Sequence, residues 1–113
     1  MPRPMTEVRY TERKCAQGTL MRLQASGHCG LIESGVDVGC RASSCLACAL
    51  ADAAADFESG GSDIKDGEAI VTVVASDEEY ERASGCFHVA RAGFAALEKM
   101  YPDNFRYEEK IDG

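Results

Sequence analysis

The feature that most constrains the fold is a long helical stripe near the C-terminus. Apolar residues recur there at alternating steps of three and four, and Pro102 ends the run. They are Tyr80, Ala83, Phe87, Ala90, Phe94, Leu97 and Tyr101. Because such steps return to one side of an α-helix at every turn, the segment predicts a helix with a single core face. Ser76 and Glu79 match a capping box that would begin this helix.

The rest of the chain predicts one small α+β domain over residues 1–113. Five segments are predicted strands: 5–10, 19–26, 62–65, 68–76 and 105–110. The alanine-rich segment 40–57 predicts a second helix, whose core face would carry Leu46, Ala49, Leu50, Ala53 and Phe57. Asp66-Gly67 predicts a hairpin turn, and Ser59-Gly60-Gly61-Ser62 a linker. The order ββαββαβ indicates one antiparallel or mixed sheet covered by two helices.

The charge and composition of the chain argue against some classes of binding partner. The chain has 12 Lys and Arg against 19 Asp and Glu, for a net charge of −7, which argues against nucleic acid as a partner. The chain contains no run of about 18 apolar residues that could cross a membrane. The N-terminus lacks the apolar core of a signal peptide. We therefore expect a cytoplasmic protein with reduced thiols.

The candidate catalytic residues lie in and next to a glycine-rich segment. His28 and Cys40 lie twelve positions apart across residues 27–39, which we expect to form a mobile loop. Cys40 would begin the first helix, where the helix dipole and the adjacent Arg41 are expected to lower the thiol pKa. Amides at the helix start would form an oxyanion hole. A thiol within reach of an imidazole is the arrangement of an activated nucleophile.

The spacing of these residues resembles that of a known family. The pattern Gly27-His28-x-Gly30, Gly35-x-Asp37-Val38-x-Cys40-x-x-x-Ser44 is similar to that of the ribosomal-processing cysteine proteases, called Prp. The opening hairpin, the long second helix and the final strand also fit that family.

The resemblance implies a small α+β homodimer that needs no cofactor and no metal. Such enzymes remove a short N-terminal extension from the large-subunit ribosomal protein L-twenty-seven, and phage-borne relatives process capsid or scaffold proteins. Carried over, Cys40 is the nucleophile and His28 the general base, Asp37 supports the site, and Ser44 bonds near the helix start. The substrate loop would carry Gly27, Gly30, Gly35, Gly39 and Arg41.

Three positions depart from the family pattern. Cys29 stands where a small alanine is usual, Gly39 is part of a Val-Gly pair that replaces a bulkier Ile-Val pair, and Arg41 replaces a small residue. Asp37 could equally be a plain helix cap, and Ser44 a plain serine of the first turn.

Two other classes stay open from the residues alone. Cys40-x4-Cys45-x2-Cys48 is the spacing of plant-type [2Fe–2S] ferredoxins, although an alanine-rich helix former follows Cys48. A catalytically silent binding relative is the other alternative. Otherwise Cys45, Cys48 and Cys86 are expected to be small buried core residues. The two histidines lack the spacing of a zinc finger.

Overall fold

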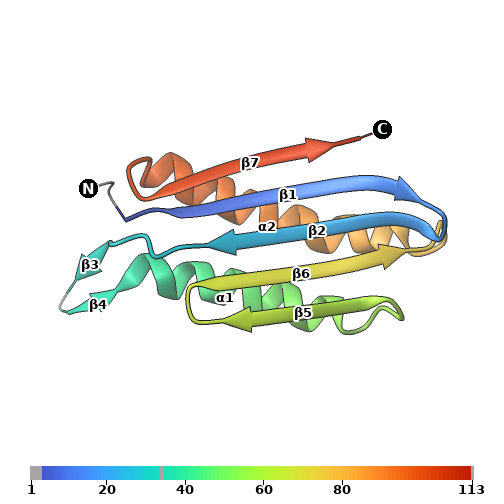
Figure 1. The fold of residues 1–113 in the computed structure, drawn as a ribbon, viewed down its shortest axis with the longest axis horizontal. Coiled ribbons are helices and arrows are strands. Elements are labelled where there is room, and N and C mark those ends of the chain that lie inside the picture. Colours follow the sequence, from blue (N-terminus) through green and yellow to red (C-terminus); the bar gives the residue numbers. More distant parts are fainter. Residues whose placement is uncertain (1–3, 34, 113) are drawn as a thin grey trace.

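The computed structural model describes residues 4–33 and 35–112, and it has the predicted order of main elements (Figure 1). The strands are β1 (Thr6–Cys15), β2 (Gly18–Ser26), β3 (Ile32–Glu33), β4 (Val36–Asp37), β5 (Gly60–Lys65), β6 (Glu68–Ala75) and β7 (Phe105–Ile111). The helices are α1 (Val38–Ala54) and α2 (Tyr80–Met100). Residues 1–3, which begin the segment examined for a signal peptide, lie outside the described residues.

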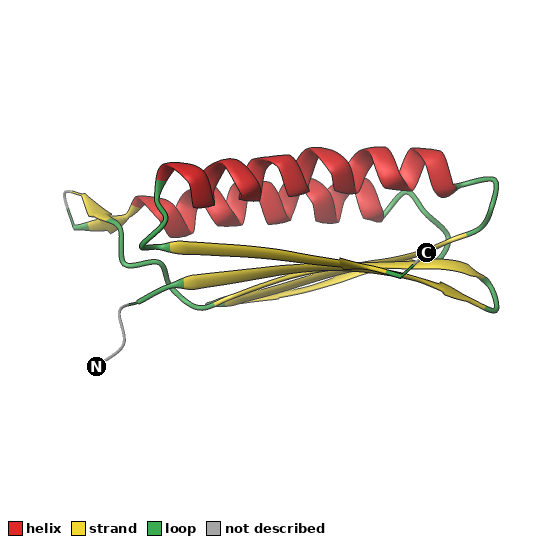
Figure 2. Cartoon of the chain, turned by 90° about the horizontal axis from the view of Figure 1, so that it is seen from above, coloured by secondary structure: helices red, strands yellow, loops and turns green. Residues whose placement is uncertain are grey.

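Five strands form one mixed sheet in the order β5-β6-β2-β1-β7. β1 and β7 pair in parallel, whereas the other neighbours are antiparallel. Both helices lie on one face of this sheet (Figure 2). The fold is therefore the α+β domain that the sequence predicts, with a mixed sheet and two covering helices. No helix among the described residues is long and apolar enough to cross a bilayer.

The core lies between the sheet and the helices. β2 and β6 alternate buried and less buried residues along their length, as expected for strands with one face against the core. Their inward side chains include Met21, Leu23, Val71 and Val73, all fully buried.

The stripe on α2 faces this core as predicted. Ala83, Phe87, Ala90 and Phe94 are its buried residues, and the ring of Phe87 lies 5.5 Å from that of Tyr10. The predicted capping pair also bonds: the Ser76 amide donates to Glu79 Oε1 at 3.1 Å, and the Glu79 amide donates to Ser76 Oγ at 3.3 Å. The helix itself begins one turn later than predicted, with Glu79 as its N-cap.

The prediction for α1 was partly wrong. Its buried residues are Gly39, Ser43, Ala47, Leu50 and Ala54, whereas Ala49 is exposed. The helix ends at Ala54 because the chain turns there, with the Asp56 amide bonded to the Ala53 carbonyl and the Phe57 amide to the Ala54 carbonyl. Phe57 is buried, but from the turn that follows the helix.

This register also corrects the expectation for the cysteines. Cys45 and Cys48 are exposed, and Cys86 is only partly buried. Five small or apolar residues one turn apart already fill the contact face of α1, so the two helix cysteines fall on the opposite side.

Two predicted irregular segments contain strand. Residues 27–39, predicted as a loop, hold the short hairpin of β3 and β4. The predicted linker 59–62 gives Gly60 and Gly61 to β5, where they pair with β6. Pairing with a central strand outweighs the low strand propensity of glycine here.

Candidate active site

The site lies at the end of the domain where β2 stops and α1 starts (Figure 1). His28 follows β2, and Cys40 lies in the first turn of α1. The structure brings them together: Cys40 Sγ is 3.4 Å from His28 Nδ1. His28 is exposed and Cys40 is half-buried, so both groups are accessible to a ligand.

Asp37 organises the residues around the thiol. It is the N-cap of α1, and its Oδ1 accepts the Cys40 amide at 3.0 Å. The same oxygen accepts the Cys29 thiol at 2.9 Å. Its Oδ2 accepts the Gly30 amide at 3.0 Å and the Cys40 thiol at 3.2 Å. Asp37 therefore caps the helix and contacts both thiols, and none of these bonds goes to the imidazole.

These contacts set the charge of the site. Burial would raise the pKa of Asp37, but the hydrogen bonds from Cys29, Cys40 and Gly30 outweigh it and hold the pKa well below its usual value. Burial and the Asp37 carboxylate raise the pKa of the Cys40 thiol, although the Cys29 amide and thiol oppose them. The expected lowering of this pKa was therefore wrong. The Asp37 carboxylate accepts the Cys40 thiol at 3.2 Å, whereas the Arg41 side chain, which was expected to lower the pKa, is exposed.

The turn between β5 and β6 lies against the histidine. The Gly67 carbonyl accepts the Gly27 amide at 2.8 Å. A Cβ on Gly67 would stand 3.1 Å from His28 Nε2, and Gly67 has a φ of +77°. Glycine is thus favoured both by the turn and by the ring beside it. The turn itself was predicted, but its place beside His28 was not, because no local pattern reports this long-range contact.

Cys29 is a second residue that the sequence reasoning did not place in the site. Its side chain is fully buried, and its carbonyl accepts Asn104 Nδ2 at 2.7 Å. A Cβ on Gly39 would overlap Cys29 Sγ. The two departures from the family pattern are therefore linked: the larger residue at 29 occupies the space that the smaller residue at 39 leaves. The joint departure of positions 29 and 39 from the family pattern was the signal in the sequence that could have revealed this contact.

A cleft of about 120 Å³ opens in front of the thiol and the imidazole. One wall is the start of α1, including Ser43 and Ser44, and the other is the β5–β6 turn with Ile64. Gly27 also lines it. Ser44 therefore lies at the cleft, but among the described residues its side chain does not form the hydrogen bond expected near the helix start.

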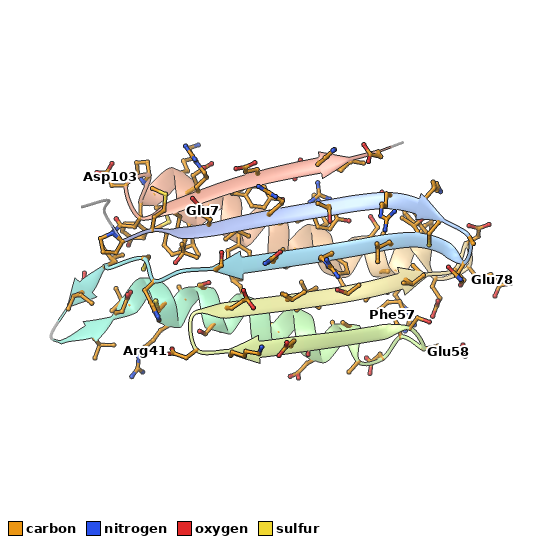
Figure 3. All side chains as sticks on the ribbon, viewed as in Figure 1. Glu7, Arg41, Phe57, Glu58, Glu78 and Asp103 are labelled. Carbon is orange, nitrogen blue, oxygen red and sulfur yellow. The ribbon has the colours of Figure 1, made fainter. Side chains whose placement is uncertain are left out.

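Of the other predicted substrate-loop positions, Gly30, Gly35 and Gly39 do not line this cleft. Arg41 lines a shallow hollow beside it, together with Cys45 and Cys48, and points outward near the start of α1 (Figure 3). Gly30 contributes its amide to Asp37. Gly35 lies at the β3–β4 turn, with nothing within 4 Å of where its Cβ would be.

Two of the amides at the start of α1, where the sequence predicts an oxyanion hole, already have acceptors. The Cys40 amide is bonded to Asp37, and the Val38 amide donates to the Leu31 carbonyl at 3.0 Å. Both amides are needed for the cap and for anchoring the preceding loop.

The ferredoxin alternative does not fit the geometry. A plant-type cluster needs a loop that wraps around its iron atoms, whereas Cys40, Cys45 and Cys48 lie within one continuous helix. Neither exposed cysteine belongs to the group of close thiol and carboxylate ligands found among the described residues.

No protein-family model and no curated protein sequence matches this chain. Solved structures match its fold over almost the full length. SMU.848 from Streptococcus mutans is 19% identical with a TM-score of 0.70, covering 96% of each chain. The ribosomal processing protease Prp from S. aureus, in complex with a covalently linked product peptide, is 21% identical with a TM-score of 0.69. It covers 94% of this chain and 100% of that one.

The same S. aureus protease in complex with a substrate peptide is 20% identical, with a TM-score of 0.66 and the same coverage. The structural neighbours thus include the protease that the sequence pattern resembles. At these identities the likeness shows the fold.

Proposed function

We propose that this protein is a cysteine endopeptidase with a Cys40–His28 dyad. The observation that carries the proposal is the 3.4 Å approach of Cys40 Sγ to His28 Nδ1 at the mouth of a cleft. The same fold in a protease with a bound peptide supports it.

The raised pKa of Cys40 decides how such a dyad works. The thiol is protonated at rest, with its proton directed either to Asp37 Oδ2 or to His28 Nδ1. For reaction, His28 takes this proton at Nδ1 as general base while the sulfur attacks the scissile carbonyl. The imidazolium then donates the proton to the leaving amine, and water hydrolyses the acyl-enzyme. His28 is therefore needed to create the nucleophile, and Asp37 holds the thiol and the helix start in place.

The proposed substrate is the short N-terminal extension of a large-subunit ribosomal protein, L-twenty-seven, or a phage structural protein. The S. aureus neighbour is a ribosomal processing protease solved with a substrate peptide and with a covalently linked product peptide, which supports a peptide ligand of this class. The cleft lies between a helix start and a hairpin turn and is lined by both Cys40 and His28, so a peptide bound there reaches the proposed dyad. A ribosomal substrate also places the proposed enzyme in the cytoplasm.

The experiment is cleavage of such an extension peptide, followed by mass spectrometry. Wild type should cut it at one bond, whereas Cys40→Ala and His28→Ala should not. Cys15→Ser is the matched control, because that thiol lies at the far end of β1. Cleavage that persists in Cys40→Ala would remove the proposal.

One observation favours a second candidate, a silent peptide-binding relative. Burial and the Asp37 carboxylate raise the pKa of the Cys40 thiol and so disfavour the thiolate. The two candidates separate on the same peptide: a binding protein holds it without cutting it, and its Cys40 stays unreactive toward alkylating agents.

We also propose a homodimer, as the family resemblance implies. A chain of 113 residues buries a modest core, and the second face of the sheet carries no helix (Figure 2). Light scattering at micromolar concentration should give twice the chain mass, and a persistent monomer would contradict this part alone.

A further inference from the structure

The proposed dyad leaves one buried thiol beside the site, that of Cys29, without a role. Cys29 Sγ, Asp37 and Cys40 Sγ offer ligand atoms that all lie within 4.8 Å of one another. Proteolysis by Cys40 and His28 uses no second thiol. Two thiols converging on one carboxylate are instead a donor set typical of a zinc site.

The hydrogen bonds show how a metal would enter. Each thiol donates a hydrogen bond to a different oxygen of Asp37: Cys29 to Oδ1 at 2.9 Å and Cys40 to Oδ2 at 3.2 Å. Neighbouring ligands around tetrahedral zinc are separated by roughly 3.3–3.8 Å, given bond lengths of about 2.0–2.3 Å. The donors therefore need only a small outward shift to surround an ion that replaces the two thiol protons.

The backbone around these donors is already fixed. The Gly30 and Cys40 amides bind the Asp37 carboxylate, and Asn104 Nδ2 binds the Cys29 carbonyl. Gly39 leaves the space that Cys29 Sγ occupies. Such outer contacts orient metal ligands in proteins. On the open side, His28 Nδ1 lies 3.4 Å from Cys40 Sγ but is not one of the three mutually close donors, so a water can supply the fourth ligand.

We propose that Zn²⁺ binds to Cys29, Asp37 and Cys40 and thereby blocks the nucleophile reversibly. Two S–H bonds break, two Zn–S bonds form, and both protons leave to solvent without a change of oxidation state. The block on cleavage rests on the proposed function, whereas the metal site itself does not. The sequence expectation of no metal considered the histidines and the cysteine spacing, but not this spatial cluster.

The test uses proteins in a Cys45→Ser, Cys48→Ser background, because these exposed thiols on one helix face could bind zinc themselves. Zinc affinity is measured by competition with a chromophoric chelator. The background protein should bind one Zn²⁺, and addition of Cys29→Ser should weaken that binding at least about tenfold. Cys29→Ala, which has the residue usual in the resembled family, is the second variant, and circular dichroism checks that both fold.

Cobalt gives an independent readout of the ligands. Co²⁺ in the background protein should show thiolate-to-cobalt charge-transfer absorption, which falls by about half in Cys29→Ser because one of two thiolates is lost. Equal zinc affinity and equal cobalt absorption in the Cys29 variants would overturn the proposal, since Cys40 and His28 would then hold the metal alone. Absence of binding would overturn it as well.

Cleavage is assayed separately, once with a chelator and once with zinc. Zinc should inhibit the background protein at a concentration at least about tenfold lower than it inhibits Cys29→Ser. If no peptide is cut even with the chelator, the proposed protease function fails, while the zinc and cobalt titrations still decide the metal site.

Discussion

The two helices cover the same face of the sheet but are built differently. α2 buries Phe87 and Phe94 among alanines and carries no residue of the candidate site. α1 buries mainly Gly39, Ser43, Ala47 and Ala54, with Leu50 as its one large buried side chain. Its first turn holds Cys40, and Asp37 caps it.

This difference separates stability from chemistry along the chain. Large aromatic side chains on α2 bury much apolar surface, which dominates folding free energy. Small residues on α1 let its start approach the sheet and the Cys29 segment closely, which places the thiol without covering it. Variants at the start of α1 should therefore change reactivity, and variants on α2 should change stability.

The largest expected effect is on cleavage. Cys40→Ala and His28→Ala should each lower the rate by about a thousandfold or more, and the double variant should be no worse than either one. The reason is that the thiol and its base act as a unit. Single-turnover assays on the extension peptide measure this, with urea unfolding as a check that stability is retained. Independent, multiplying losses would contradict the dyad.

The next effect falls on α2. Phe87→Ala should lower the free energy of unfolding by about 3–5 kcal/mol, because it leaves a cavity against Tyr10. Val89→Ala is the matched control on the same helix, since Val89 is 69% exposed, and should change stability by about 0.5 kcal/mol or less. Urea denaturation compares them. Similar losses of unfolding free energy in both variants would contradict the assignment of stability to the buried face of α2.

A smaller effect should appear where α1 meets Cys29. Gly39→Ala places a methyl group on Cys29 Sγ and should cost about 1–3 kcal/mol by overpacking. The double variant Cys29→Ala, Gly39→Ala should recover most of that loss. A double-mutant cycle from urea unfolding measures the coupling. Additive losses would show that the two positions do not share one space.

The smallest effect is a shift in pH dependence. Asp37→Asn keeps a side chain suited to capping but removes the negative charge that raises the pKa of Cys40. The thiolate then forms more readily, so the midpoint of Cys40 alkylation should move to lower pH. The profile is measured in the background lacking the exposed Cys45 and Cys48. An unchanged or higher midpoint would contradict the assigned charge effect.

The predictable parts of this fold are those with local periodicity. The stripe of α2, the capping pair and the turn at Asp66-Gly67 follow from residues close in sequence, and the structure has all three. The stripe of α1 was misassigned because alanine fits either face of a helix, so composition does not determine which face is buried.

For the site, the sequence indicated His28, Cys40 and Asp37 by spacing, and they lie together. It missed Cys29 and the place of Gly67, because their contacts join segments that no local pattern connects. It also gave the wrong direction for the Cys40 pKa. The spacing of the residues indicated that Cys40 lies at a helix start. It did not indicate that the Asp37 carboxylate would accept a hydrogen bond from this thiol.

The hydrogen bond between Gly27 and Gly67 limits which insertions and substitutions the β5–β6 turn can tolerate. Hairpin turns at a sheet edge usually accept insertions easily. Here the turn is both a wall of the cleft and the neighbour of the His28 ring. A single added residue would displace wall and imidazole together, so the cleft can vary in the side chains of Ile64 or Lys65 but not in the length of this turn.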